Sequence, residues 1–111
     1  MKLLGTIVIT AVLFGIALFA GTAQAADGKE IFQAKCQACH GATGMGNETL
    51  AKAFKLEPEW LNLTKKQTQA YRDTELADIV KFGKGRMPAF NGKLGDADIK
   101  AVVQFIRSLK K

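Results

Sequence analysis

The 111-residue sequence is short of the residues that build most metal and disulfide sites: it has one histidine, two cysteines and two prolines. A single histidine excludes any metal site that needs two imidazoles from this chain. Two cysteines cannot form the several bridges of a disulfide-rich mini-protein. The length allows one small domain and excludes a multidomain enzyme. A disordered polyelectrolyte is also excluded, because only 23% of the residues are charged while 48% are hydrophobic.

Charge is missing from the beginning of the chain. Lys2 is followed by 18 uncharged residues, 3–20, and then by a small-residue A-x-A pattern that ends at Ala25. This order is typical of a secretory signal peptide (residues 1–25), and we expect its cleavage to leave a domain of residues 26–111 with a net charge of +5. The alternative is an uncleaved anchor, since about 18 apolar residues are just enough to span a bilayer. Either way, the folded part is predicted to be exported, to the periplasm.

The remaining sequence has no internal repeat and no alternating strand pattern, so we predict an all-α domain. From Ile99 to Leu109, apolar residues recur every three or four positions, as on one face of a helix. Residues 41–46 and 83–93 are rich in glycine and are predicted to be loops with a large flat group between them. We expect three main helices and two weaker helical turns. The first helix is capped by Asp27, with Glu30 as its reciprocal partner, and reaches His40; the second covers residues 74–82 and ends at Gly83; the third is capped by Asp96. The weaker turns are expected over residues 49–55 and 65–71.

The motif that carries chemistry is C-x-x-C-H, formed by Cys36, Cys39 and His40. This is the attachment signature of c-type haem. Its spacing places two sulfurs on one side of a helical turn, where they reach two carbons on one porphyrin edge, and the next residue supplies an imidazole to the iron. A dithiol redox motif would need a βαβ context, and a structural zinc site would need a fourth protein ligand. A simple disulfide across two residues would be strained. We therefore predict one covalently bound haem c.

The second axial position of the iron cannot be filled by histidine, so methionine is the expected ligand. Met87 lies 47 residues after His40, which is ample chain to wrap around the ring, and Pro88 holds it in an extended backbone. Met45 follows His40 by only five residues. We therefore predict His40 and Met87 as the axial ligands, with an open sixth position as the main alternative.

With these residues in place, the chain resembles the class I monohaem cytochromes c, in one of their short bacterial forms, over residues 27–111. Gly28 and Phe32 precede Cys36 by eight and four residues, as in the family's first helix, which crosses the last helix at a glycine–aromatic contact. Val102 and Phe105 match the apolar–aromatic pair of that last helix. The family's helix and ligand loop are matched by Leu76, Ile79, Gly83, Gly85, Met87, Pro88 and Phe90. The resemblance implies a small cytochrome c fold wrapped around one haem, and an electron carrier rather than an enzyme.

One feature departs from many relatives, which have a proline soon after the haem motif whose carbonyl accepts a hydrogen bond from the proximal imidazole. Here no proline occurs between His40 and Pro58. We expect another carbonyl, from residues 44–47, to take this place. Such a bond tunes the metal through its ligand.

A six-coordinate iron leaves no site for a substrate, so the predicted function is one-electron transfer through the haem edge. Trp60 and Tyr71 are candidates for hydrogen bonds to the haem propionates. The haem pocket is predicted to be lined by Phe32, Leu50, Phe54, Leu61, Leu63, Ile79, Phe82, Phe90 and Phe105.

Basic residues predict the class of partner. If they surround the haem edge, they would steer encounter with redox proteins that have acidic docking surfaces. Nucleic acid is not expected as a partner, and a membrane is expected only through an uncleaved N-terminus or a membrane complex. Two alternatives stay open: a haem c subunit docked in a larger membrane oxidase or dehydrogenase, and a haem enzyme or gas sensor with an open sixth position. The basic residues are Lys52, Lys55, Lys65, Lys66, Lys81, Lys84, Arg86 and Lys93.

Overall fold

The computed structural model describes residues 27–111, and the predicted signal peptide lies outside this range. Within it, all regular structure is helical apart from two isolated β-bridges. None of the helices in this range has the length and apolarity to cross a bilayer. The elements are α1 (Gly28–Lys35), α2 (Gln37–His40), α3 (Glu48–Ala53), the 3-10 helix η1 (Pro58–Leu61), α4 (Lys66–Gln69), α5 (Asp73–Phe82) and α6 (Asp96–Ser108). The all-α prediction is confirmed.

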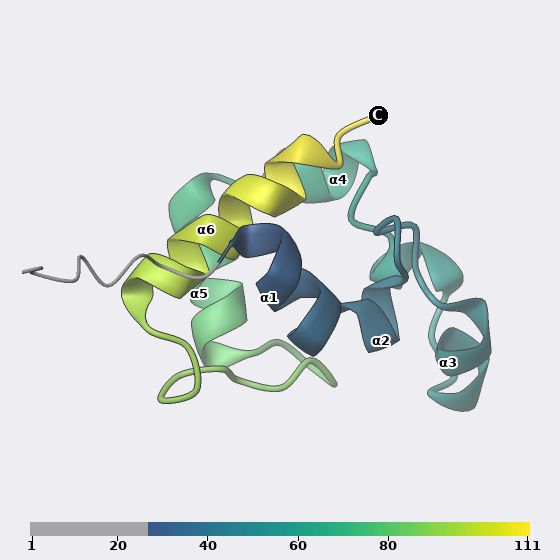
Figure 1. Cartoon of the computed structure of the whole chain (residues 1–111). Helices are drawn as coiled ribbons and strands as arrows, with labels where there is room; N and C mark the ends of the chain where they lie inside the picture. The colour runs from purple at the N-terminus through teal and green to yellow at the C-terminus, as the bar shows by residue number, and fades with distance from the viewer. Residues whose placement is uncertain (1–26) are drawn as a thin grey trace, which may run out of the picture.

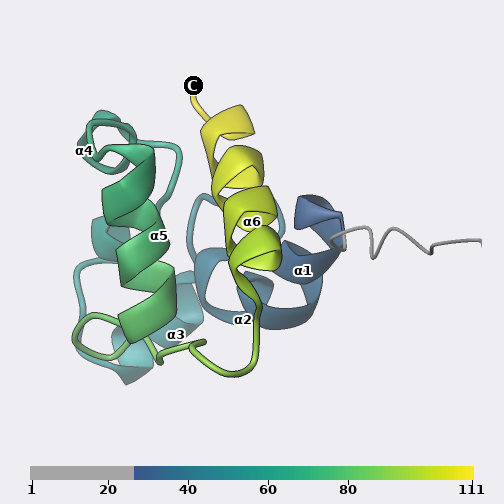
Figure 2. The same cartoon turned by 90° about the vertical axis from the view of Figure 1, so that its left-hand side faces the viewer.

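Helix α6 packs against both α1 and α5, and these three helices enclose the core (Figures 1 and 2). Helix α3 packs instead on η1, and α2 lies between α1 and α3 (Figure 1). The domain therefore has a three-helix part and a smaller part built on α3 and η1. The buried core residues of the three-helix part are Ile31, Phe32, Leu76, Val80, Phe90, Ile99, Val102, Val103 and Ile106.

The α1–α6 crossing is close because Gly28 has no side chain. A Cβ atom there would lie 2.1 Å from the carbonyl oxygen of Ala101 in α6. One turn further along α1, the fully buried Phe32 meets Phe105 with ring centroids 5.0 Å apart. The glycine–aromatic crossing predicted from the sequence is thus present.

The helix boundaries differ from the prediction in three places. The first helix ends at Lys35 rather than at His40, and α2 begins after Cys36 (φ −116°, ψ −31°). The side chain of Asp27 does cap α1, but its bond is to the amide of Lys29 and no reciprocal bond from Glu30 is present. Helix α6 has Gly95 as its cap, and Asp96 is its first residue. The predicted end of α5 at Gly83 is confirmed, with φ +76°.

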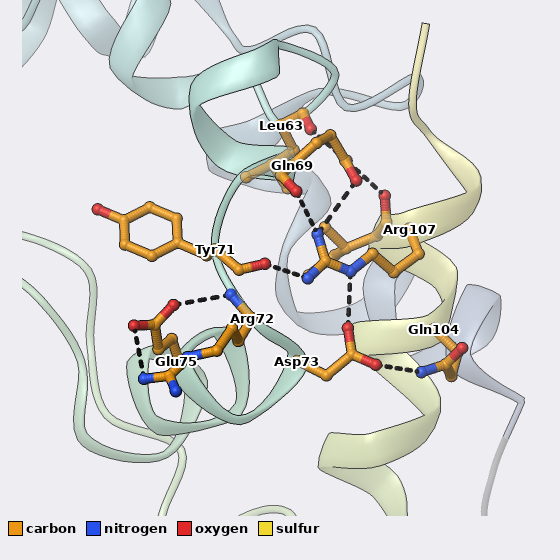
Figure 3. A network of polar contacts seen from close by, with 9 residues as sticks. Leu63, Gln69, Tyr71, Arg72, Asp73, Glu75, Gln104 and Arg107 are labelled. Atoms are coloured by element: carbon orange, nitrogen blue, oxygen red, sulfur yellow. Dashed lines mark hydrogen bonds and ion pairs between the residues drawn. The ribbon is translucent and has the colours of Figure 1, made fainter.

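A polar network ties the segment before α5 to α6 (Figure 3). The Arg107 guanidinium donates to the Asp73 carboxylate (2.7 Å) and to the backbone carbonyls of Gln69 (3.0 Å) and Tyr71. Gln104 donates a second bond to Asp73 (3.2 Å). These bonds, led by that from Arg107, hold the pKa of Asp73 below its usual range. Residues 69–73 are consequently fixed against the C-terminal helix.

Candidate functional site

The haem motif lies at the junction of α1 and α2. Cys36 sits between the two helices, and Cys39 and His40 are in α2, where the amides of both donate to the Cys36 carbonyl (3.2 and 3.0 Å). These bonds form the single helical turn that the C-x-x-C-H spacing predicts. Both cysteines are free thiols and half-buried, so a disulfide between them is not formed.

The thiol chemistry also argues against the other readings of the motif. Burial, followed by the neighbouring Cys39, raises the pKa of the Cys36 thiol to about 11. A reactive dithiol needs the opposite shift, towards the thiolate. Within residues 27–111, moreover, no three or more His, Cys, Asp or Glu side chains gather into a group that could hold a metal ion such as zinc.

His40 is held by the backbone of Leu61, at the end of η1. The distance from its Nδ1 atom to the Leu61 carbonyl oxygen is 2.8 Å. A carbonyl can only accept, so Nδ1 carries the proton, and in the neutral imidazole Nε2 then carries the lone pair. Burial lowers the pKa of His40, while the bond to Leu61 acts in the opposite direction. The result is a neutral imidazole with a fixed orientation and one nitrogen available to a metal.

The prediction that residues 44–47 supply this carbonyl is wrong. That segment is engaged elsewhere: the Gly44 carbonyl accepts from the amide of Leu63 (2.7 Å), and the amide of Gly46 donates to the His40 carbonyl (2.7 Å). The bond from Leu63 brings the end of η1 to the imidazole. Pro58, at the first position of η1, is a sequence signal that could have indicated this short helix.

Met87 lies in a tight turn after α5. Its amide donates to the Lys84 carbonyl (2.9 Å), and its own carbonyl accepts from the Lys84 amide (3.2 Å). Gly83 precedes this turn with φ +76°, and Gly85 lies within it with φ +57°. A Cβ atom at Gly83 would lie 2.5 Å from the Met87 carbonyl oxygen. The Met87 side chain is half-buried and packs on the core. The close approach to Met87 is thus made at Gly83, whereas a Cβ at Gly85 would have no atom within 4 Å.

Met45 is placed differently. Its side chain is 50% exposed, and its sulfur accepts a hydrogen bond from the Lys111 ammonium (3.4 Å). Beside it, Gly44 lies against Leu109, since a Cβ at Gly44 would be 2.6 Å from a methyl carbon of that leucine. The Met45 sulfur is therefore directed to the C-terminal end of the chain.

Most of the residues predicted to line the pocket are buried or half-buried, but Phe82 is 63% exposed. It is the last residue of α5, and the Lys81 ammonium lies 5.7 Å from the centre of its ring. Trp60 is also mostly exposed, at 72%. The Tyr71 hydroxyl accepts a hydrogen bond from Lys84 (3.1 Å). The propionate contacts of Trp60 and Tyr71 stay predictions.

The donor set fits a haem: two free thiols on one helical turn, a neutral imidazole next to them, and a thioether in a glycine-bounded loop. Known proteins support the same conclusion. Residues 23–106 match the family described as cytochrome c oxidase, cbb3-type, subunit III. A cytochrome c6 from a Picosynechococcus species is 36% identical over 107 residues, covering 91% of this chain and 85% of that protein. The chain belongs to the c-type cytochromes.

Two further relatives show the range of the family. A cytochrome c6 from Gloeothece citriformis is 31% identical over 112 residues, covering 95% of this chain and 91% of that protein. The cbb3-type cytochrome c oxidase subunit FixP of Bradyrhizobium diazoefficiens is 35% identical over 88 residues, which cover 77% of this chain but only 27% of FixP. The matches thus include both cytochromes c6, which are electron carriers rather than enzymes, and a subunit of a cbb3-type oxidase.

The fold agrees with the family. The solved structure named KustC0563 c-type cytochrome superposes with a TM-score of 0.65 at 25% identity, covering 77% of this chain and 99% of that one. Both the class I resemblance and the helical architecture are confirmed.

Proposed function

We propose that this c-type cytochrome is an exported one-electron carrier. In this proposal one haem c is joined through the sulfurs of Cys36 and Cys39, and its iron is bound by His40 and Met87. The bond from His40 Nδ1 to the Leu61 carbonyl carries the proposal, because it leaves Nε2 as the only metal-binding atom of the only imidazole in the chain.

Met87 is the better sixth ligand on two counts. The Met45 sulfur is already hydrogen-bonded to Lys111, whereas the Met87 sulfur has no such partner among the described residues. Met87 also packs on the core from a loop whose ends are fixed, since the amide of Phe90 donates to the Val80 carbonyl in α5 (3.0 Å). A thioether ligand stabilises the ferrous state and so raises the reduction potential.

The bound haem would supply reversible exchange between ferric and ferrous iron. The protein's part is to hold two axial ligands without a free position for substrate and to surround the ring with apolar side chains. Leu50, Phe54 and Ile79 are only half-buried by protein atoms, although they are large and apolar, which suits residues that line a cofactor. A low-polarity environment and fixed ligands reduce the reorganisation that accompanies electron transfer.

A second candidate is a haem domain that works within a larger membrane oxidase. The match to the cbb3-type subunit III family and to FixP favours it. It predicts that the cytochrome purifies with a large membrane partner and retains residues 1–25 as an anchor. A free carrier instead purifies alone, beginning at Ala26.

The surface charge supports acidic redox partners. Of the eight basic residues in the middle of the chain, Lys65 is paired with Glu59 (2.9 Å) and Lys81 with Asp96 (3.6 Å). The other six have no ion-pair partner among the described residues, so their charge is available to a partner. They are Lys52, Lys55, Lys66, Lys84, Arg86 and Lys93.

Electron transfer to an acidic redox protein should therefore slow as salt is added. We expect the second-order rate constant, measured by stopped-flow absorbance, to fall about 10-fold or more between low and high ionic strength. The double variant K52E/K55E, which reverses two charges near α3, should lower the low-salt rate and flatten its salt dependence. K100E reverses an exposed charge on α6 and is the matched control. A rate that does not depend on salt would refute the docking proposal.

A further inference from the structure

The loop that carries Met87 has two basic side chains, Lys84 and Arg86, and each lies on an aromatic ring from another part of the chain. The Lys84 ammonium is 5.4 Å from the centre of the Tyr71 ring and donates to its hydroxyl (3.1 Å). The Arg86 guanidinium is 5.2 Å from the centre of the Phe54 ring. The Arg86 distance is one at which a cation is attracted by the face of a ring, whereas Lys84 is held mainly by its hydrogen bond to the Tyr71 hydroxyl.

The Lys84 contact acts directly on the backbone of Met87. The backbones of Lys84 and Met87 donate a hydrogen bond to each other across the turn, so a contact that fixes Lys84 also fixes the backbone of Met87. Tyr71 is itself fixed, because its carbonyl accepts from Arg107 in α6 (Figure 3). A continuous set of contacts thus runs from α6 through Tyr71 to the turn of Met87.

The Arg86 contact reaches the other part of the domain. Phe54 is the half-buried residue that ends α3, and α3 packs on η1, whose last residue, Leu61, binds His40. Arg86 precedes Met87 directly. Its contact with Phe54 therefore joins the loop of one proposed iron ligand to the segment that orients the other.

We propose that Lys84 and Arg86 are positioning residues that hold the Met87 loop in place and would slow the departure of the Met87 sulfur from a bound haem iron. This inference rests on the proposed ligation by Met87. Each contact is partly exposed and individually weak, but together they tie the chain just before Met87 to two different parts of the domain. Removing either of these two contacts should raise the rate at which the loop opens, and removing both should raise it further.

Imidazole binding to the ferric holoprotein tests this directly, because at saturating imidazole the rate is limited by departure of the methionine. Imidazole is largely neutral at pH 8, so a change of protein charge does not alter its approach. We expect K84Q and R86Q each to raise the limiting rate about two- to five-fold, and the double variant about 10-fold. R86K should restore most of the slow limiting rate that is lost in R86Q. Y71F keeps the ring but removes the hydroxyl, so it should retain only part of the Lys84 contact.

K93Q is the matched control, since Lys93 is an exposed cation in the same inter-helix segment and its side chain has no ion pair or ring contact with the described residues. In a double-mutant cycle, F54L should have little further effect once Arg86 is replaced. Limiting rates in K84Q and R86Q equal to that of K93Q would overturn the inference, and so would additive effects of F54L and R86Q. Failure of Met87 ligation itself is distinguishable, because the wild-type ferric protein would then lack the weak long-wavelength sulfur-to-iron band before any imidazole is added.

Discussion

Replacing Met87 with alanine should abolish the weak long-wavelength band that a methionine sulfur gives with ferric haem. The variant should also bind carbon monoxide in the ferrous state without having to displace a ligand. Because the thioether favours ferrous iron, its loss should lower the reduction potential by on the order of 0.1–0.3 V, within the ~0.8 V range that axial ligands span. Absorbance spectra and a redox titration measure all three.

Met45→Ala is the natural control for this experiment. The Met45 sulfur bonds to Lys111 at the surface, so its removal should leave the band and the potential unchanged. Loss of the band in Met45→Ala, with its retention in Met87→Ala, would reverse the axial assignment.

Replacing Gly28 with alanine should have the largest effect on stability. The new Cβ would lie 2.1 Å from the carbonyl oxygen and 2.6 Å from the carbonyl carbon of Ala101, and backbone atoms cannot move aside as a side chain can. Helices α1 and α6 would have to separate, which also disturbs the contact between Phe32 and Phe105. We expect a loss of about 3 kcal/mol in the free energy of unfolding, or about 12–24 °C in the melting temperature.

Gly95→Ala provides the comparison, because it is the same substitution at a position with φ −75° and no atom within 4 Å of the new Cβ. Its cost should stay below about 1 kcal/mol, which reflects only the weaker helix cap. Thermal unfolding of the ferric holoproteins, followed by far-UV circular dichroism, measures both. Equal stability of the two variants would show that the α1–α6 crossing is not as close as described.

The sequence predicted well where a chemical requirement is local. The spacing of Cys36, Cys39 and His40 implies one helical turn, and that turn is present in α2. Gly28 and Gly83 are conspicuous because glycine is needed where backbones approach or φ is positive, and both perform these roles. The amphipathic pattern that ends at Leu109 likewise predicted α6 to within about a turn.

The prediction failed where distant segments decide the outcome. No pattern in the sequence indicates that Leu61 supplies the carbonyl to His40, because that choice depends on the bond between Gly44 and Leu63. Phe82, which was placed in the pocket from its apolar character, is 63% exposed at the end of α5, and its contact with a haem stays a prediction. The contacts of Lys84 and Arg86 with aromatic rings depend on how the loop folds back across the domain.

The optical spectrum of the purified protein, recorded oxidised and then reduced, tests the central claim most directly. A haem held through two thioethers and bound by His40 and Met87 should give a coloured low-spin protein with the ferric sulfur band, and reduction should be fully reversible. The colour should stay with the chain under acid–acetone extraction. A colourless protein, or a high-spin spectrum without the sulfur band, would contradict the account.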